Sequence, residues 1–210
     1  MILEIFRRIG AGQRTFVEVG IGDGIENNTA LLHSLGWTGV WIDARPPPAP
    51  FPPGLRFEAG FATRENIAGL FTALDVPREV DLCSLDIDQN TYYLWEALSG
   101  WSPRVIVVEY NASLPAGVDW KVQYAPDRVW DGTANFGASL TAFELLGRRR
   151  GYALVHCELS GANAFFVRTD LVAEKFAGPF DSVTHYEPPR YSLDYRSGHP
   201  RARLDRQPPA

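Results

Sequence analysis

The sequence is poor in cysteine, with only two among 210 residues, and neither belongs to a C-x-x-C pair or stands near a group of histidines. This scarcity argues against a disulfide-stapled secreted scaffold and against a zinc site. Because Cys83 and Cys157 both fall in apolar segments, we expect them to be buried free thiols.

Long hydrophobic runs and an excess of positive charge are also missing. No apolar run approaches the roughly 18 residues of a membrane-spanning helix, and residues 1–10 are too short and amphipathic for a secretory signal. The 20 Lys and Arg are outnumbered by 25 Asp and Glu, whereas nucleic-acid binding needs clustered positive charge. We expect a cytoplasmic protein with a small-molecule partner and with neither a membrane nor a nucleic-acid partner; homo-oligomerisation stays open.

The composition is that of a globular protein, with 45% hydrophobic and 12% aromatic residues. A chain of this length forms a sizeable core, so we predict a single domain over residues 1–184. Residues 185–210 are rich in Pro and Arg and lack apolar periodicity, which indicates a partly mobile tail.

Short apolar runs alternate with segments of helical periodicity through most of the chain. Strands are expected at 16–19, 40–43, 55–58, 80–85 and 105–108, and helices at 29–35, 65–74, 92–98 and 138–149. This alternation is typical of a parallel sheet with helices on both faces, which binds ligands at the carboxyl ends of its strands. The last two apolar runs, 152–157 and 164–168, are so close in sequence that they predict an antiparallel hairpin.

The first predicted strand runs into a glycine-rich loop with the pattern Glu18-x-Gly20-x-Gly22-x-Gly24. Glycine permits positive φ and removes each Cβ that would block a ligand, so such a loop can wrap a cofactor. The spacing differs from the dinucleotide fingerprint, which needs glycine where this chain has Ile25. The loop therefore predicts a nucleoside cofactor and disfavours a nicotinamide dinucleotide.

Acidic residues surround this loop. Asp43 ends the second predicted strand, where a carboxylate can accept hydrogen bonds from both hydroxyls of a ribose. Asp23 and Glu26 would repel a pyrophosphate but not a sulfonium cation. A side chain among residues 27–29 is expected to cap the following helix.

The glycine pattern, the strand–helix alternation and the final hairpin resemble class I S-adenosylmethionine-dependent methyltransferases, over residues 15–168 or so. The resemblance implies a Rossmann-like doubly wound α/β sheet, mostly parallel with a C-terminal antiparallel hairpin. It also implies that Glu18, Gly20, Gly22 and Gly24 hold the methionine part of S-adenosylmethionine, while Asp43 binds its ribose.

A second acidic segment follows the fourth predicted strand. Asp86 and Asp88 are two residues apart and so share one side of an extended chain. The segment is similar to the Ile-Asp-Val-Glu-Gly motif of FkbM-type methyltransferases, with Asp86 matching its Asp and Asp88 its Glu, and we assign Asp86 to cofactor binding. Gln89 replaces the glycine of that motif, which indicates a divergent subgroup.

Methyl transfer from a sulfonium requires an aligned acceptor and, for weak acceptors, a base. Asp88 and Glu109 are the candidate bases, and His156 is a less favoured one because it lies inside an apolar run. Tyr92 and Asn111 lie close to these carboxylates in sequence and are expected to contact the substrate. Oxygen ligands of this kind also suit Mg²⁺ or Ca²⁺, but a divalent metal is not favoured, since the carboxylates serve equally as base or ammonium ligand.

A long connection at residues 112–137 separates the fifth predicted strand from the next helix, and long loops of this kind are often functional lids. Its Tyr124 and Trp130 are expected to grip a sugar ring or flat molecule, unless they pin the loop to the core. The sequence thus predicts O-methylation of a small molecule, a sugar or a biosynthetic intermediate. The alternatives are a nicotinamide-dependent oxidoreductase and a non-catalytic cofactor-binding relative.

Overall fold

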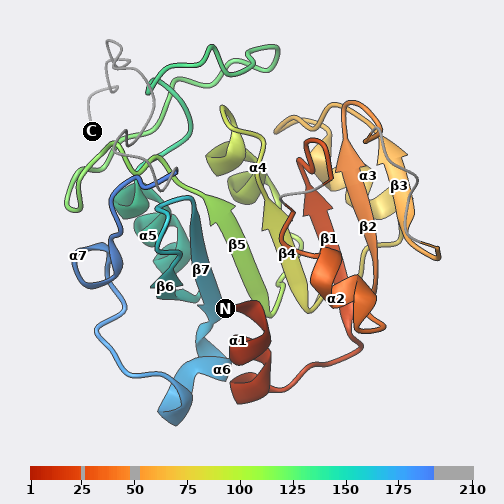
Figure 1. Cartoon of the computed structure of the whole chain (residues 1–210), viewed down its shortest axis with the longest axis horizontal. Helices are drawn as coiled ribbons and strands as arrows, with labels where there is room; N and C mark the ends of the chain where they lie inside the picture. The colour runs from red at the N-terminus through yellow and green to blue at the C-terminus, as the bar shows by residue number, and fades with distance from the viewer. Residues whose placement is uncertain (25–26, 48–52, 192–210) are drawn as a thin grey trace.

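Seven strands form one sheet through the centre of the molecule, in the order β3-β2-β1-β4-β5-β7-β6 (Figure 1). The computed structural model describes residues 1–24, 27–47 and 53–191. The strands are β1 (Thr15–Val19), β2 (Thr38–Asp43), β3 (Arg56–Ala59), β4 (Leu82–Leu85), β5 (Val105–Glu109), β6 (Tyr152–Cys157) and β7 (Asn163–Arg168). Strands β1 to β5 pair in parallel, whereas β7 is antiparallel to both β5 and β6. The predicted fold class, a mostly parallel α/β sheet that ends in an antiparallel hairpin, is confirmed.

Helices cover both faces of this sheet. They are α1 (Ile2–Ile9), α2 (Ala30–Ser34), α3 (Ile67–Ala73), α4 (Thr91–Ala97), α5 (Leu140–Arg149), α6 (Thr169–Val172) and α7 (Ser182–His185), with a 3₁₀ turn, η1, at Ala173–Lys175. Buried residues of α3, α4 and α5 share one core cluster with alternate strand residues, and those of α1 and α2 share the other. Helix α1 was not predicted; its apolar face is short but buries Ile2, Ile5, Phe6 and Ile9.

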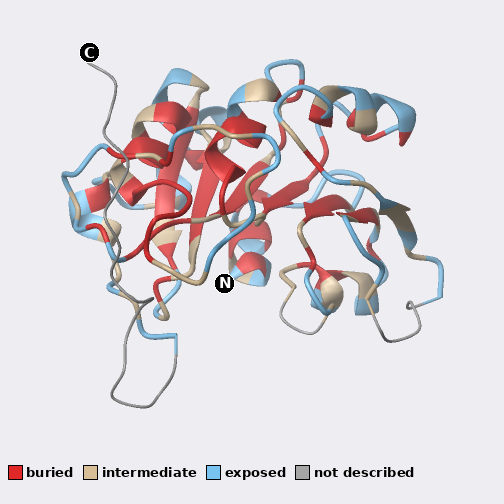
Figure 2. Cartoon of the chain, turned by 90° about the horizontal axis from the view of Figure 1, so that it is seen from above, coloured by how far each residue is buried: buried red, intermediate tan, exposed pale blue. Residues whose placement is uncertain are grey.

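The central strands are apolar because both of their faces are covered. All four residues of β4 are buried, and four of the five in β5 are buried as well. The view from above in Figure 2 shows the buried residues concentrated along these strands. Cys83 in β4 and Cys157 in β6 are buried and free, which confirms the prediction for the two thiols. Within the described ranges, no helix is long and apolar enough to cross a membrane.

The segment after α7 packs against the end of β5. The Tyr186 hydroxyl donates a hydrogen bond to the Ala112 carbonyl at 2.7 Å, and the Tyr110 hydroxyl donates to the Glu187 carbonyl at 2.7 Å. Residues 185–191 thus contact the domain, while residues 192–210 of the expected tail lie outside the described part. The domain boundary near residue 184 stays a prediction.

Candidate active site

A cavity of about 720 Å³ lies at the carboxyl ends of the parallel strands. Its wall is formed by residues 18–23, 27, 42–45, 60–62, 86–88, 90 and 128–130. Its volume falls within the roughly 300–1,000 Å³ that is typical of small-molecule sites. Parallel pairing brings the ends of β1, β2, β3 and β4 to one edge, so segments far apart in sequence share this cavity.

The glycine loop after β1 packs directly against the end of β4. Gly20 has φ +82°, and a Cβ there would lie 1.6 Å from the backbone carbonyl oxygen of Asp86. Gly22 also has positive φ, but its Cβ would meet no atom within 4 Å. Gly20 is therefore required by close packing within the protein, whereas Gly22 leaves bare backbone facing open space. Ile25 and Glu26 lie outside the described residues.

Asp43 fastens this loop to the end of β2. Its Oδ2 accepts hydrogen bonds from the backbone N–H groups of Ile21 at 2.8 Å and Gly22 at 3.1 Å. Its Oδ1 accepts one from the N–H of Arg45 at 3.1 Å. Because a carboxylate offers about four acceptor positions, these three bonds leave little capacity for other donors. Asp43 lines the cavity, and its contact with a ribose stays a prediction.

Glu18 is 1% exposed, and backbone donors surround its carboxylate. Oε1 accepts from the N–H of Asn28 at 2.7 Å, and Oε2 accepts from the N–H of Thr29 at 3.1 Å and from its hydroxyl. Thr29 is the N-cap residue of α2 but makes no side-chain capping bond. The prediction that a side chain of residues 27–29 caps this helix is therefore wrong at its N-cap; Glu18 accepts these N–H groups instead. Burial raises the pKa of Glu18, although its hydrogen bonds oppose the shift.

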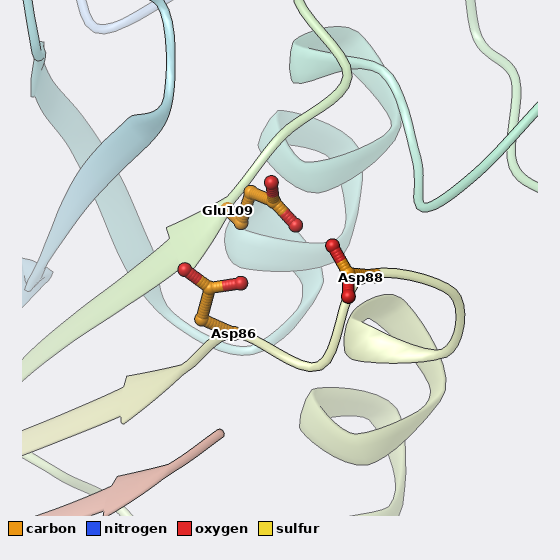
Figure 3. A group of neighbouring side chains, drawn as sticks. All are labelled: Asp86, Asp88 and Glu109. Carbon is orange, nitrogen blue, oxygen red and sulfur yellow. The ribbon is translucent and has the colours of Figure 1, made fainter. Parts of the chain in front are cut away.

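Three carboxylates converge beyond the ends of β4 and β5. Figure 3 shows Asp86, Asp88 and Glu109 turned toward one another. One carboxylate oxygen from each lies within 4.8 Å of those from the other two. We name these residues the acidic trio. The structure thus brings these three carboxylates together, whereas their roles stay predictions.

The environment of the acidic trio raises the pKa of all three carboxyl groups. Burial and then the charge of Asp88 raise the pKa of Asp86 to about 7. Burial, followed by repulsion from Asp86 and Asp88, raises the pKa of Glu109 well above its usual value, and burial alone raises that of Asp88. Asp88 also has φ +57°, an unusual backbone conformation for a residue with a Cβ. Three carboxyl groups with pKa values raised in this way are typical of a functional site.

The connection between β5 and α5, residues 112–137, is held down by side chains from beneath it. Four side chains donate hydrogen bonds to its backbone carbonyls: Gln89 to Asn135, Asn90 to Ala125, Tyr93 to Val122, and Asn111 to both Ala134 and Phe136. Gln89 and Asn90 come directly after Asp88 in the chain. This gives a physical reason for the amide at position 89, where the resembling motif has glycine.

The tip of this connection reaches the cavity. Val129 and Trp130 line it and remain 65% and 38% exposed, and Phe61 after β3 lines it with 44% exposed. The Trp130 indole N–H donates to the Thr133 carbonyl at 2.8 Å, which fixes the ring. The rim of the cavity therefore carries apolar side chains together with Arg128, while Asp86 and Asp88 make its floor acidic. Trp130 was predicted from sequence, whereas Val129 and Phe61 were missed; Phe61 follows a strand end, a signal that could have identified it.

Tyr124 does not line the cavity. Its hydroxyl hydrogen-bonds to the carboxylate of Glu65, and the guanidinium of Arg64 lies 4.3 Å from its ring centroid. Tyr124 thus attaches the connection to the segment before α3. This matches the alternative in which an aromatic residue pins the loop, and its predicted contact with a substrate has no support from this position.

Gly24 and Glu109 also lie outside the cavity wall, and so do three further candidates. Tyr92 is buried, and its hydroxyl accepts a hydrogen bond from Arg149 at 3.0 Å. Asn111 is fully buried, and its side-chain N–H group donates hydrogen bonds to backbone carbonyls of the connection. His156 lies on β6, two strands beyond β5, where burial lowers its pKa. The structure does not bring these last three side chains to the acidic trio, and their substrate or base roles stay untested predictions.

No protein-family model matches the chain, and no curated protein matches it in sequence. Solved structures with a similar path of the chain include the MycE methyltransferase from the mycinamycin biosynthetic pathway in complex with Mg and SAH, at 16% identity and a TM-score of 0.48. That match covers 78% of this chain and 46% of MycE, so the chain spans about half of MycE's length.

A second similar structure is the 1,6-didemethyltoxoflavin-N1-methyltransferase of Burkholderia thailandensis with bound 1,6-didemethyltoxoflavin and S-adenosylhomocysteine. It has 15% identity and a TM-score of 0.48, and the match covers 79% of this chain and 74% of that one. A third is the pyocyanin biosynthetic protein PhzM, with 18% identity and a TM-score of 0.40. The match covers 80% of this chain and 54% of PhzM. Each similarity concerns the arrangement of strands and helices.

Proposed function

We propose that this protein is an S-adenosylmethionine-dependent methyltransferase that methylates an oxygen atom of a small molecule. The observation that carries the proposal is one cavity with two chemically different ends. A glycine loop and Asp43 form one end, and Asp86 and Asp88 with the tip of the connection form the other, with Glu109 next to these two carboxylates. Such a cavity suits a reaction in which a nucleoside cofactor and an acceptor meet.

The first end suits the methyl donor. Positive-φ glycines leave backbone accessible, and Ile42, Phe61 and Ala62 supply apolar wall for a flat base. The wall also carries the carboxylates of Glu18, Asp23 and Asp43, which outnumber the guanidinium of Arg45 at this end. Negative charge favours a ligand with sulfonium and ammonium groups over one with a pyrophosphate. This balance supports S-adenosylmethionine rather than a dinucleotide.

The second end suits the acceptor. In the proposed reaction, the acceptor oxygen attacks the methyl carbon, the carbon–sulfur bond breaks, and sulfur keeps the electron pair to leave S-adenosylhomocysteine. The hydroxyl proton passes to a carboxylate of the acidic trio. Asp88 is the first candidate because it lines the cavity and has a raised pKa, so it takes up a proton more readily than an ordinary aspartate. Glu109 stands behind it and shares the added proton.

The connection over the cavity completes the site. Val129 and Trp130 cover the rim with apolar surface, which excludes water from the reacting atoms and offers a ring face to the acceptor. Tethers from Gln89 and Asn90 place this rim relative to Asp88. Acceptor position and base position are therefore set by one stretch of chain.

Isothermal titration calorimetry with S-adenosylmethionine and S-adenosylhomocysteine tests the donor end. We expect both to bind, and Asp43→Ala to weaken binding by about tenfold or more, since it removes a charged hydrogen-bond acceptor. Glu174→Ala is the matched control, because it removes an exposed carboxylate on η1 that does not line the cavity. Circular dichroism checks that both variants fold.

Absence of binding by either ligand contradicts the proposal. Enhanced NADH fluorescence in the presence of the protein, without S-adenosylmethionine binding, would point to the oxidoreductase alternative. Cofactor binding without methyl transfer to any member of a panel of hydroxylated small molecules would point to the non-catalytic alternative.

A further inference from the structure

The acidic trio contains one buried oxygen that lacks a hydrogen-bond donor, although Asp86 accepts the backbone N–H of Asp88. Oε2 of Glu109 is buried and has no hydrogen-bond partner among the described residues. Its neighbours in Figure 3 are two further carboxylates, so the only donor that these side chains can supply is a carboxyl proton shared between Asp86 and Glu109. Buried polar atoms in folded proteins are normally satisfied, and an exception points to a missing ion or ligand.

A second, independent side chain shows the same deficit. Asn90 is only 3% exposed and belongs to the wall of the same cavity. Its Nδ2 donates to the Ala125 carbonyl at 2.9 Å, while its Oδ1 is buried and without a partner in the described part of the chain. The orphaned atom is again an oxygen acceptor, and it lies two residues from Asp88. The carboxylate oxygen of Glu109 and the amide oxygen of Asn90 thus both lack a positively charged or hydrogen-bond-donating partner among the described residues.

The other carboxylates of the cavity serve as an internal control. Glu18 accepts three hydrogen bonds, two of them from backbone N–H groups, and Asp43 accepts three from backbone N–H groups. Both lie at the same edge of the sheet and line the same cavity. The orphaned carboxylate oxygen is therefore a feature of Glu109 in the acidic trio and is not shared by Glu18 or Asp43.

From these observations we propose that Asp86, Asp88 and Glu109 bind a divalent cation, with Asn90 as the neighbouring neutral oxygen. The donor set consists of carboxylate and amide oxygens without nitrogen or sulfur ligands, which is typical of Mg²⁺, Mn²⁺ or Ca²⁺ rather than Zn²⁺ or Cu²⁺. Three carboxylates carry enough negative charge to offset the loss of water from such an ion. Its remaining coordination positions face the cavity, where Asp88 lines the wall.

Such a cation would change how the acceptor end works. A hard cation binds and polarises an acceptor oxygen and lowers its pKa, so that the proton leaves more readily. It would also offset the repulsion between the three carboxylates. The sequence alone does not favour a metal, because the carboxylates can serve as base or ammonium ligand. Neither role supplies a partner for the orphaned oxygens of Glu109 and Asn90 in the unliganded protein.

The experiment is a calorimetric titration of the EDTA-treated, full-length protein with Mg²⁺, Mn²⁺ and Ca²⁺, with electron paramagnetic resonance to count bound Mn²⁺. We expect one site per chain. Asp86→Asn and Glu109→Gln should each weaken binding by about tenfold or more, since each removes a charged ligand. Glu174→Gln, on the exposed turn η1, should bind as the parent does. Glu109→Asp, which keeps the charge, should retain more affinity than Glu109→Gln.

Two results would overturn the inference. One is no stoichiometric binding of any of the three cations up to roughly 10 mM, well above the weakest biological calcium sites. The other is binding that all variants share equally, which would mean adventitious surface binding only. Titration of the metal-free protein with S-adenosylhomocysteine separates this outcome from the proposed function. If that ligand binds while the cations do not, the cation site fails and the methyl-donor site stands.

Discussion

The two ends of the cavity use the same residue types in opposite ways. After β1 and β2, Glu18 and Asp43 receive backbone N–H groups and hold the protein's own loops in place. After β4 and β5, Asp86, Asp88 and Glu109 face one another. Carboxylates at strand ends therefore support structure at one end of the site and remain available to a ligand at the other.

The difference arises from where the nearby N–H groups point. The loops after β1 and β2 curve back, so that Ile21, Gly22 and Asn28 offer their N–H groups to a carboxylate. After β4, the N–H of Ile87 donates to the Thr91 hydroxyl instead. After β5, the N–H groups of residues 110 and 111 donate to the carbonyls of residues 162 and 138. Oε2 of Glu109 lacks a donor because neighbouring structure has already used these N–H groups, whereas Asp86 accepts the backbone N–H of Asp88.

Replacement of Gly20 should have the largest effect, because the two ends of the cavity touch at this residue. An alanine Cβ would overlap the Asp86 carbonyl oxygen at 1.6 Å in a positive-φ conformation. We expect Gly20→Ala to lower the free energy of unfolding by about 4 kcal/mol or more, or to prevent folding. Gly22→Ala is the control, with open space around its Cβ and an expected cost of about 1–2 kcal/mol from φ alone. Equal losses in urea unfolding would refute the close-packing role.

Removing one carboxylate charge at each end of the cavity tests whether the carboxylates at the two ends differ in their contribution to stability. Glu18→Gln places an amide donor against backbone donors, so unfolding at pH 8 in EDTA should show a loss of about 1–3 kcal/mol. Glu109→Gln removes a charge that lacks a donor, so its stability should be unchanged or higher under the same conditions. A loss of similar size in both variants would show that the two ends do not differ.

A pH series sharpens the same contrast. The folded-state pKa of Asp86 is about 7, above its ordinary value of 3.8, so the native state binds more protons than the unfolded state between these values. Its contribution to stability is therefore fully present below the lower value and is lost as pH rises through about 7. We expect the melting temperature of Asp86→Asn, relative to the parent, to be higher at pH 8 than at pH 5 in EDTA. A difference that does not vary with pH would contradict the raised pKa.

The smallest effect is expected at Tyr124, which holds the connection outside the cavity. Tyr124→Phe loses the hydrogen bond to Glu65 but keeps the ring beneath Arg64, so we expect a loss of about 0.5–1.5 kcal/mol. Affinity for S-adenosylhomocysteine should be unchanged, because this residue does not line the cavity. A large loss of affinity would contradict this expectation, because it would mean that Tyr124 contributes to cofactor binding as well as holding the connection in place.

Periodicity and strand ends predicted much of this molecule. Alternating apolar runs located each strand to within a few residues, and the short link before residue 164 fixed the final antiparallel pair. The same logic placed Asp43, Asp86 and Asp88 at the cavity, because parallel strands bring their carboxyl ends together. These features depend on local pattern and on one general rule of sheet geometry.

Contacts made across space could not be predicted in this way. The backbone donors for Glu18 lie ten and eleven residues away, and their direction depends on how the loop closes. Gln89 looked like a departure from a motif, and only its contact with Asn135 explains it. Tyr124 and Trp130 have similar chemistry and lie in the same connection, yet one ties it down and the other lines the cavity, because the connection folds back on itself.

The tethers of this connection also make its tip a replaceable part. Val122 and Ala125 are held on one side of the tip, and Ala134, Asn135 and Phe136 on the other, while residues 126–133 between them span the rim. Loops fixed at both ends accept changes in length and sequence at modest cost. A different eight-residue tip could thus be grafted between these anchors to redirect the protein toward other acceptors, while the carboxylates beneath it keep their positions.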